Sequence, residues 1–93
     1  MKPLTIRFFS RFKRDIKRLK KQHKDMEKLK AVIRLLASRQ ELPPACHDHP
    51  LKNDWADFRD CHIEPDWVLI YQIKEDMLTL VLARTESHSE LEL

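Results

Sequence analysis

The hydrophobic periodicity changes twice along the chain, and these changes limit the folds that it can adopt. Leu4, Ile6 and Phe8 alternate with polar residues, as in a strand with one buried face. From Phe9 to Leu36 the apolar residues recur every three or four positions, as in amphipathic helices. After residue 54 short apolar runs and alternation return. This order predicts an α+β fold: an N-terminal strand, a two-helix hairpin and an antiparallel sheet of three further strands.

Two helices account for the middle of this pattern. We expect Ser10 to cap the first helix, which ends near Gln22 and His23, and Asp25 to cap the second. The expected buried residues of the two helices are Phe9, Phe12, Ile16 and Leu19, followed by Met26, Leu29, Ile33 and Leu36.

The second half predicts a loop and three strands. The stretch ELPPACHDHPLKND has no useful periodicity and reads as a loop. The expected strands are 55–63, 67–73 and 77–84, with a polar tail at 85–93. The chain contains no glycine, so its turns have to use Pro, Asn, Asp or short polar runs, such as Glu64-Pro65-Asp66 and Lys74-Glu75-Asp76.

Length and composition exclude several classes of protein. With 93 residues, the chain is expected to form a single domain, 1–93. The N-terminal residues contain no apolar stretch long enough for a signal peptide, which predicts a cytoplasmic protein with Cys46 and Cys61 reduced. The apolar runs WVLIY and MLTLVLA are much shorter than the roughly 20 residues that span a bilayer, so we expect no membrane association.

Charge is distributed unevenly along the sequence. Residues 1–40 hold 14 Lys and Arg against 3 Asp and Glu, whereas residues 41–93 hold 4 against 12. This asymmetry favours a polyanionic partner, RNA first and DNA second, bound by the basic helix. The candidate RNA-binding cations are Arg11, Arg14, Lys17, Arg18 and Lys21.

The residues that can carry chemistry lie in the second half. Imidazoles and a carboxylate can move protons near neutral pH, an arginine can neutralise phosphate, and an indole can stack on a base. This composition permits metal-free RNA cleavage by the neighbouring 2'-hydroxyl. Ordinary roles stay open at this stage: a turn residue for Asp66, a core residue for Trp55 or Trp67, and a surface ion pair for Arg84. The candidates for chemistry are His47, His49, His62, Asp66, Arg84 and His88.

A zinc site is the alternative for the cysteines and histidines. Its ligands would come from Cys46, His47, His49, Cys61 and His62. These residues form adjacent Cys-His pairs without the Cys-x-x-Cys or His-x-x-x-His spacing of common zinc sites. The sequence therefore predicts no metal and no cofactor.

The motifs resemble a known family. The succession KDMEKLKAVIRLLA, DHPL, RDCHIEPDWVLIY, ART and SHSEL is similar to the YafQ branch of the RelE/ParE superfamily of bacterial type II toxins, over nearly the whole chain. The resemblance implies a RelE-like fold and a ribosome-dependent endoribonuclease, an mRNA interferase that cuts messenger RNA in the decoding site. It also implies inhibition by a cognate antitoxin protein, with operator DNA bound only through the antitoxin complex.

The resemblance assigns roles to particular residues. It implies acid/base roles for His49, His62, Asp66 and His88, phosphate stabilisation by Arg84, and an RNA contact by Trp67. His47 has no counterpart in the family's motifs. The branch usually carries an aromatic residue near its C-terminus, where this chain has Glu92, so a stacking contact is expected to be missing.

Two rivals differ in class from this interpretation. One is a non-enzymatic, gyrase-inhibiting toxin of the ParE type, which would not need the histidines at these motif positions. The other is a DNA-binding module, which only the charge supports.

Overall fold

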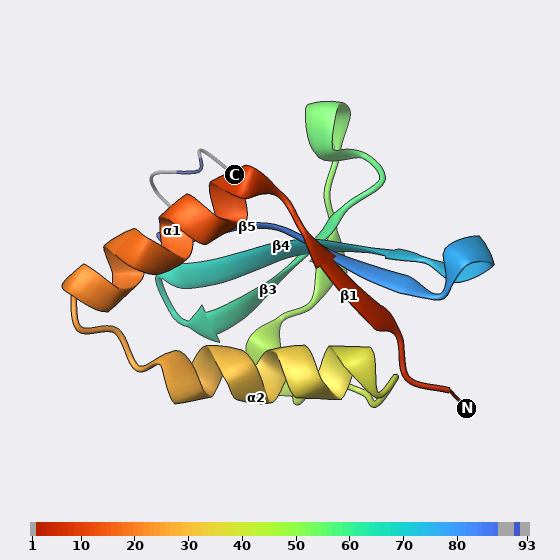
Figure 1. Ribbon diagram of the computed structural model, residues 1–93, viewed down its shortest axis with the longest axis horizontal. Coiled ribbons are helices and arrows are strands. Elements are labelled where there is room, and N and C mark those ends of the chain that lie inside the picture. Colours follow the sequence, from red (N-terminus) through yellow and green to blue (C-terminus); the bar gives the residue numbers. More distant parts are fainter. Residues whose placement is uncertain (1, 88–90, 92–93) are drawn as a thin grey trace.

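The protein forms a mixed sheet of five strands with two helices, seen in a computed structural model that describes residues 2–87 and 91 (Figure 1). The strand order is β1-β5-β4-β3-β2. The strands are β1 (Thr5–Phe8), β2 (His49–Pro50), β3 (Arg59–Glu64), β4 (Trp67–Lys74) and β5 (Thr79–Ser87). The α-helices are α1 (Ser10–Lys21) and α2 (Met26–Ala37), and the short 3-10 helices are η1 (Pro44–Cys46), η2 (Asn53–Trp55) and η3 (Glu75–Met77).

The predicted α+β order is confirmed, and the structure adds two features of the sheet. β3, β4 and β5 are antiparallel neighbours, as expected, whereas β1 pairs with β5 in parallel. The loop before β3 contains a further strand, β2, which pairs with the start of β3. The expected strand 55–63 begins only at Arg59, because Trp55 belongs to η2. The expected tail is also shorter, since β5 continues to Ser87.

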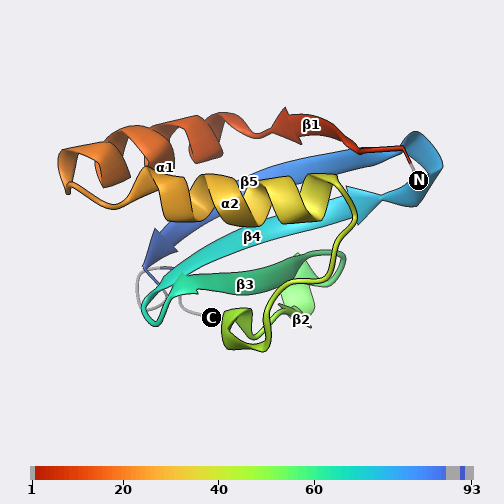
Figure 2. The ribbon, with the colours of Figure 1, turned by 90° about the horizontal axis from the view of Figure 1, so that it is seen from below.

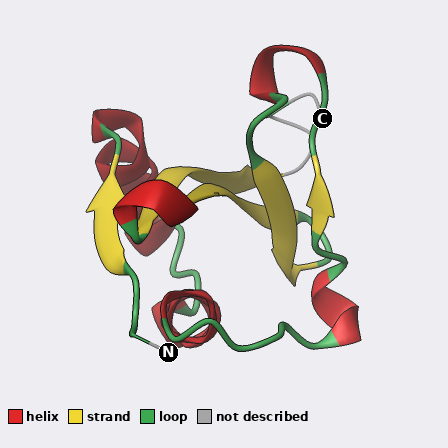
Figure 3. Cartoon of the chain, turned by 90° about the vertical axis from the view of Figure 1, so that its right-hand side faces the viewer, coloured by secondary structure: helices red, strands yellow, loops and turns green. Residues whose placement is uncertain are grey.

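The two helices occupy different places around the sheet (Figures 2 and 3). α2 lies across one face, which we call the helix face. α1 continues from β1 along the edge of β5. The predicted cap of α2 is confirmed, since the Asp25 carboxylate accepts a hydrogen bond from the Glu27 N–H at 3.0 Å. The predicted cap of α1 is wrong: Ser10 is the first helical residue, and Phe9 precedes it without a side-chain cap.

The core lies between α2, α1 and the helix face. Leu29, Val32 and Leu36 of α2 are buried against the strands, and Phe12 and Leu19 of α1 join them. The strand residues of this core are Cys61, Trp67, Leu69, Tyr71, Leu80 and Leu82. Because alternate residues of a strand point to opposite faces, the residues between them point away from α2, to a second face that we call the site face. None of the described helices is long and apolar enough to cross a bilayer.

The glycine-free turns place ordinary residues in left-handed backbone conformations. Positive φ angles occur at His23, Arg39, His47, Asn53 and Leu78. Asn53 enters this region most readily, the two histidines less so, and Arg39 and Leu78 are of types that rarely adopt it. The second hairpin therefore turns through η3 and a left-handed Leu78, and not through the polar triplet alone.

Candidate active site

Four residues form a row across the site face, and three of them are polar. The strand register places His49 of β2 opposite Asp60 of β3, Asp60 opposite Ile70 of β4, and Ile70 opposite Arg84 of β5. We call this set the cross-strand row. Three strand spacings of about 4.8 Å put the Cα atoms at its two ends about 14 Å apart. Two of the predicted residues, His49 and Arg84, therefore share one face of the sheet.

A buried acid lies beside the first histidine of the row. The Nε2 atom of His49 lies 2.7 Å from Oδ1 of Asp60. The Asp60 side chain is 0% exposed, whereas the His49 ring is 51% exposed. The Nδ1 atom of His49 lies 3.1 Å from the Pro50 carbonyl oxygen, so both ring nitrogens face an oxygen. A half-exposed imidazole held by a buried carboxylate is suited to taking up or releasing a proton.

Asp60 was not among the residues predicted from the sequence, although a signal for it was present. Asp60 and His62 are two residues apart on β3, so they belong to the same face of the strand. An acid that alternates with a candidate histidine could have been included on this ground.

The loop that carries His49 is anchored on the helix face. The Tyr71 hydroxyl donates to Asp48 at 2.6 Å, and the Arg59 guanidinium donates to the same carboxylate at 3.3 Å. Burial raises the pKa of Tyr71, and the hydrogen bond to Asp48 raises it further, so the phenol remains a donor. These bonds hold the DHPL segment against β3 and β4.

Arg84, at the other end of the row, lies in a cluster of four charged side chains. Its Nε donates to Asp15 of α1 at 2.8 Å, and its Nη2 donates to Glu86 at 2.6 Å. Arg18 completes the cluster, with contacts of 2.6 Å to Asp15 and 2.8 Å to Glu86. Within the described residues, Nη1 of Arg84 has no hydrogen-bond partner. The expected phosphate-binding arginine is thus oriented by two carboxylates with one nitrogen remaining for a ligand.

The cluster shifts the pKa of both partners in the main ion pair. Burial raises the pKa of Asp15, but hydrogen bonds from Arg84, the Thr85 N–H and Arg18 outweigh it, and the net pKa is below the ordinary 3.8. The hydrogen bond to Asp15 raises the pKa of Arg84. Both groups remain charged over the physiological range.

His62 and Asp66 lie at the β3–β4 turn. The Nδ1 atom of His62 is 3.1 Å from the Pro65 carbonyl oxygen, and its ring meets that of His47 edge to face at 5.9 Å. Asp66 is exposed at the tip. A cavity of about 460 Å³ beside this turn is lined by Ala45, His47, His62, Ile63, Glu64 and Pro65.

The predicted RNA-binding residues divide into three groups. Arg11, Arg14, Lys17 and Lys21 are exposed on α1. Arg18 is engaged by the charged cluster. Trp67 is 1% exposed in the core, and its indole N–H donates to Thr85 at 2.8 Å. This burial leaves no face of the indole open to a base.

His88, the expected general acid, and Glu92 lie outside the described residues. The part of the chain that is described contains no group of three or more His, Cys, Asp and Glu residues placed to hold a metal ion. Cys46 and Cys61 are buried free thiols, and burial raises the pKa of both.

Comparisons with known proteins agree on one family. The family model for the bacterial toxin of type II toxin-antitoxin system, YafQ, matches residues 4–93. The mRNA interferase toxin YafQ of Escherichia coli strain B / BL21-DE3 is 41% identical over 87 residues, which cover 92% of each chain.

Two solved structures extend the comparison. The first, a metal-bound toxin from Helicobacter pylori, is 48% identical with a TM-score of 0.89, covering 95% of this chain and 98% of that one. The second, the E. coli DinJ-YafQ toxin-antitoxin complex, matches with 39% identity and a TM-score of 0.87, covering 96% of this chain and 97% of that one.

Proposed function

The chain belongs to the YafQ family of bacterial type II toxins and is an mRNA interferase, and from this premise we propose that the cross-strand row is where it cuts messenger RNA. The observation that carries the proposal is the 2.7 Å contact between His49 and the buried Asp60, in the same row as Arg84. A proton carrier and a phosphate-binding cation then flank the position of a single phosphodiester.

The proposed reaction is attack by the substrate's own 2'-hydroxyl. His49 removes the hydroxyl proton with its Nδ1 atom once that atom has left the Pro50 carbonyl, while Nε2 stays beside Asp60. The 2'-oxygen forms a bond to the adjacent phosphorus while the bond to the 5'-oxygen breaks. His88 gives a proton to that leaving oxygen, and a 2',3'-cyclic phosphate remains. The Nη1 of Arg84 neutralises the phosphate as its charge rises. Every step uses side chains of the protein.

His62 and Asp66 have a neighbouring role in this proposal. The register places His62 opposite Val68 and Glu86, on the same side of the sheet as Asp60 and one pleat further along β3. From there the imidazole and the exposed carboxylate of the turn can bind the substrate or share the proton transfer. The sequence does not distinguish among His49, His62 and Asp66 as the general base, and the contact with Asp60 favours His49.

The partners follow from the family. We propose that the toxin acts on messenger RNA in the decoding site of the 70S ribosome, which places its action in the cytoplasm, and that α1 contacts ribosomal RNA. We also propose that a cognate antitoxin holds it inactive, since a YafQ relative forms a complex with the antitoxin DinJ. Operator DNA would be bound through that complex. Two relatives are named mRNA interferase toxins, and these names give no support to the gyrase-inhibiting alternative.

Mapping of messenger RNA ends on ribosomes tests the proposal. Wild-type protein should produce defined cuts, and His49→Ala and Asp60→Asn should each reduce the single-turnover rate by about 10² to 10⁴. Glu41→Ala, at an exposed position of the same loop, is the matched control and should cut normally. Thermal unfolding of each variant checks that the fold persists. Folded His49→Ala and Asp60→Asn variants that cut at the wild-type rate would overturn the proposed site.

A further inference from the structure

Three aromatic side chains form a cluster that the catalytic proposal does not use. The rings of Phe9 and Phe58 lie 6.1 Å apart at an interplanar angle of 68°, and those of Trp55 and Phe58 lie 5.2 Å apart at 89°. Phe9 joins β1 to α1, Trp55 ends η2, and Phe58 directly precedes β3. We call these three residues the aromatic wall.

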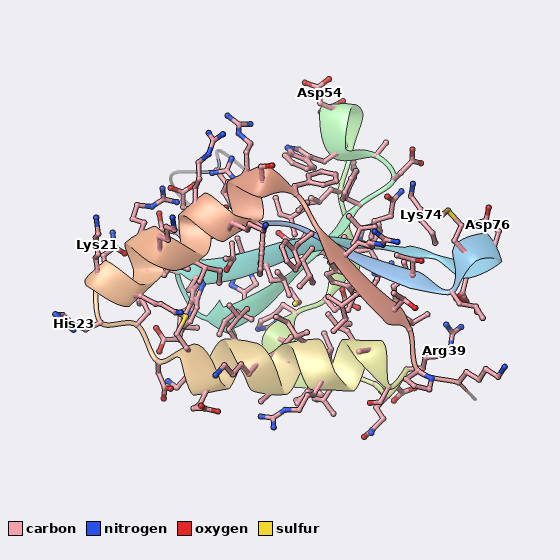
Figure 4. The ribbon with its side chains drawn as sticks, in the orientation of Figure 1. Lys21, His23, Arg39, Asp54, Lys74 and Asp76 are labelled. Carbon is pink, nitrogen blue, oxygen red and sulfur yellow. The ribbon has the colours of Figure 1, made fainter. Side chains whose placement is uncertain are left out.

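The wall stands beside the cross-strand row. Phe58 and Asp60 are two residues apart along the same stretch of chain, which puts their Cα atoms about 7 Å apart and their side chains on the same face. The Leu51 N–H donates to the Phe58 carbonyl at 2.9 Å, so the extended pairing of β2 and β3 continues as far as Phe58. The segment with η2 rises on the side of the sheet away from α2 (Figure 3), and Figure 4 shows Asp54 at its tip. The wall is therefore about one nucleotide away from His49 and Asp60.

The wall is also accessible, unlike the buried Trp67. Phe9 is 43% exposed, and Trp55 and Phe58 are half-buried. Exposed cations occur near the wall in the sequence, Lys52 just before η2 and Arg11 at the start of α1, together with the exposed carboxylates of Asp54 and Asp57. Aromatic faces flanked by cations are the usual platform for single-stranded nucleic acid, because every base can stack on a ring while the cations hold the backbone.

We propose that Phe9, Trp55 and Phe58 form a stacking site for a nucleobase of the messenger RNA that adjoins the scissile phosphate. The inference rests on the proposed function, which places that phosphate at the cross-strand row. RNA is the occupant that the structure favours because the wall is continuous with that row. The site supplies the stacking contact that Trp67 cannot make.

The test combines protein variants with abasic substrates. Phe9→Leu and Trp55→Leu keep an apolar side chain but remove the ring, and Trp55→Phe restores one. Phe8→Leu is the matched control: Phe8 is 48% exposed but packs against Phe12 and has Leu82 of the helix face as its register partner. Ribosomes carry messenger RNA in which the nucleotide on either side of the cut is made abasic, one position at a time.

Loss of one stacked base is worth roughly fivefold to a hundredfold in kcat/KM. On intact RNA, the Phe9→Leu/Trp55→Leu double variant should slow by such a factor, with Phe8→Leu unchanged and Trp55→Phe largely restored. At one abasic position the wild type should slow similarly and the double variant should show no further loss, since the two changes remove the same contact. If the double variant unfolds, the single variant Phe9→Leu, at an exposed position, replaces it in both measurements.

Two outcomes would overturn the inference. If the folded variants cut intact RNA like the wild type and respond equally to every abasic position, no base stacks on the wall. If they cut normally but lose affinity for the antitoxin, the wall is a protein-binding surface. Failure of the proposed function looks different, because wild-type protein would then produce no cuts that depend on His49 and Asp60.

Discussion

At the scale of single residues, Asp15 shows how much one side chain can determine. It is the only acidic residue among the twelve of α1, in a helix with seven Lys and Arg, and it is 2% exposed. Its carboxylate accepts hydrogen bonds from Arg84, Arg18 and the Thr85 N–H. The Thr85 N–H belongs to the edge of β5 beyond the end of β1, so Asp15 takes the place of the missing neighbouring strand there. One carboxylate thus attaches α1 to the sheet and orients the candidate phosphate-binding arginine.

We predict that Asp15→Asn weakens the fold at neutral pH and has less effect in acid. The lowered pKa means that ionised Asp15 stabilises the protein above its unfolded-state value of 3.8, and that this contribution disappears as pH falls through the lower folded-state pKa. Loss of the charged hydrogen bonds should cost about 2–3 kcal/mol at pH 7. Urea unfolding at several pH values measures this, with exposed Asp76→Asn as the control. A difference from wild type that stays constant down to pH 2 would contradict the assignment.

At the scale of elements, both helices end in the same hydrogen-bonded turn without glycine. At the end of α1 the Lys24 N–H reaches the Leu19 carbonyl and the His23 N–H reaches that of Lys20, both at 3.1 Å. Gln40 and Arg39 repeat this pattern at the end of α2. This motif needs a left-handed residue just past the helix, a position where glycine is preferred. His23 and Arg39 have φ angles of 60° and 63° there, at a conformational cost that glycine would avoid.

His23→Gly should therefore stabilise the protein. His23 is exposed, and Figure 4 shows its side chain pointing away from the molecule, so little contact is lost. Relief of the left-handed strain, minus the extra entropy that glycine has when unfolded, should leave a gain of about 0.5–1 kcal/mol. Gln22→Gly is the control, because Gln22 has φ −84° and should lose stability. Chemical denaturation compares the two, and equal effects of both changes would show that the helix end is not strained.

The elements also show how far the sequence determines the fold. The 3.6-residue period identified α1 and α2, and the Asp25 cap was predicted correctly because capping is a local interaction. Periodicity does not specify which strands pair, so β2 and the parallel pairing of β1 with β5 were missed. Trp55 was predicted to begin a strand because it is apolar, and the sequence pattern did not indicate the short helix η2 to which it belongs.

The residues of the candidate site show the same difference between what local sequence predicts and what depends on strand pairing. His49, His62 and Arg84 were identified from their side-chain chemistry and their motifs. Asp60 and the aromatic wall depend on register, which brings together residues from separate segments. The burial of Trp67 depends on which face of β4 meets α2, and a nearly continuous apolar run does not show that.

At the scale of the whole molecule, the fold pairs some acidic residues of the second half with cations of the first, such as Glu64 with Lys28, and leaves most cations of α1 exposed. The exposed cations of α1 extend along one edge of the sheet as far as Lys21, which Figure 4 shows at the end of the helix opposite to η2. Two of the carboxylates from the second half, Asp60 and Glu86, are buried and paired with side chains of the site. These two carboxylates therefore position side chains of the candidate site, while α1 presents positive charge outward.

Removal of part of this charge should weaken ribosome binding in a salt-dependent manner. Arg14→Gln with Lys17→Gln removes two exposed cations that have no acidic partner in the described residues. If both contact ribosomal phosphates, the slope of log K against log salt should fall in magnitude by about 1.4–1.8, because each contact releases about 0.7–0.9 counterion. Lys30→Gln with Arg34→Gln removes the same charge from α2 and should leave the slope almost unchanged. Sedimentation with 70S ribosomes at roughly 50 to 200 mM salt, where phosphate contacts lose affinity steeply, measures the slope for both double variants. Equal slopes for the two double variants would mean that the net charge of the molecule, and not the surface of α1, drives the association.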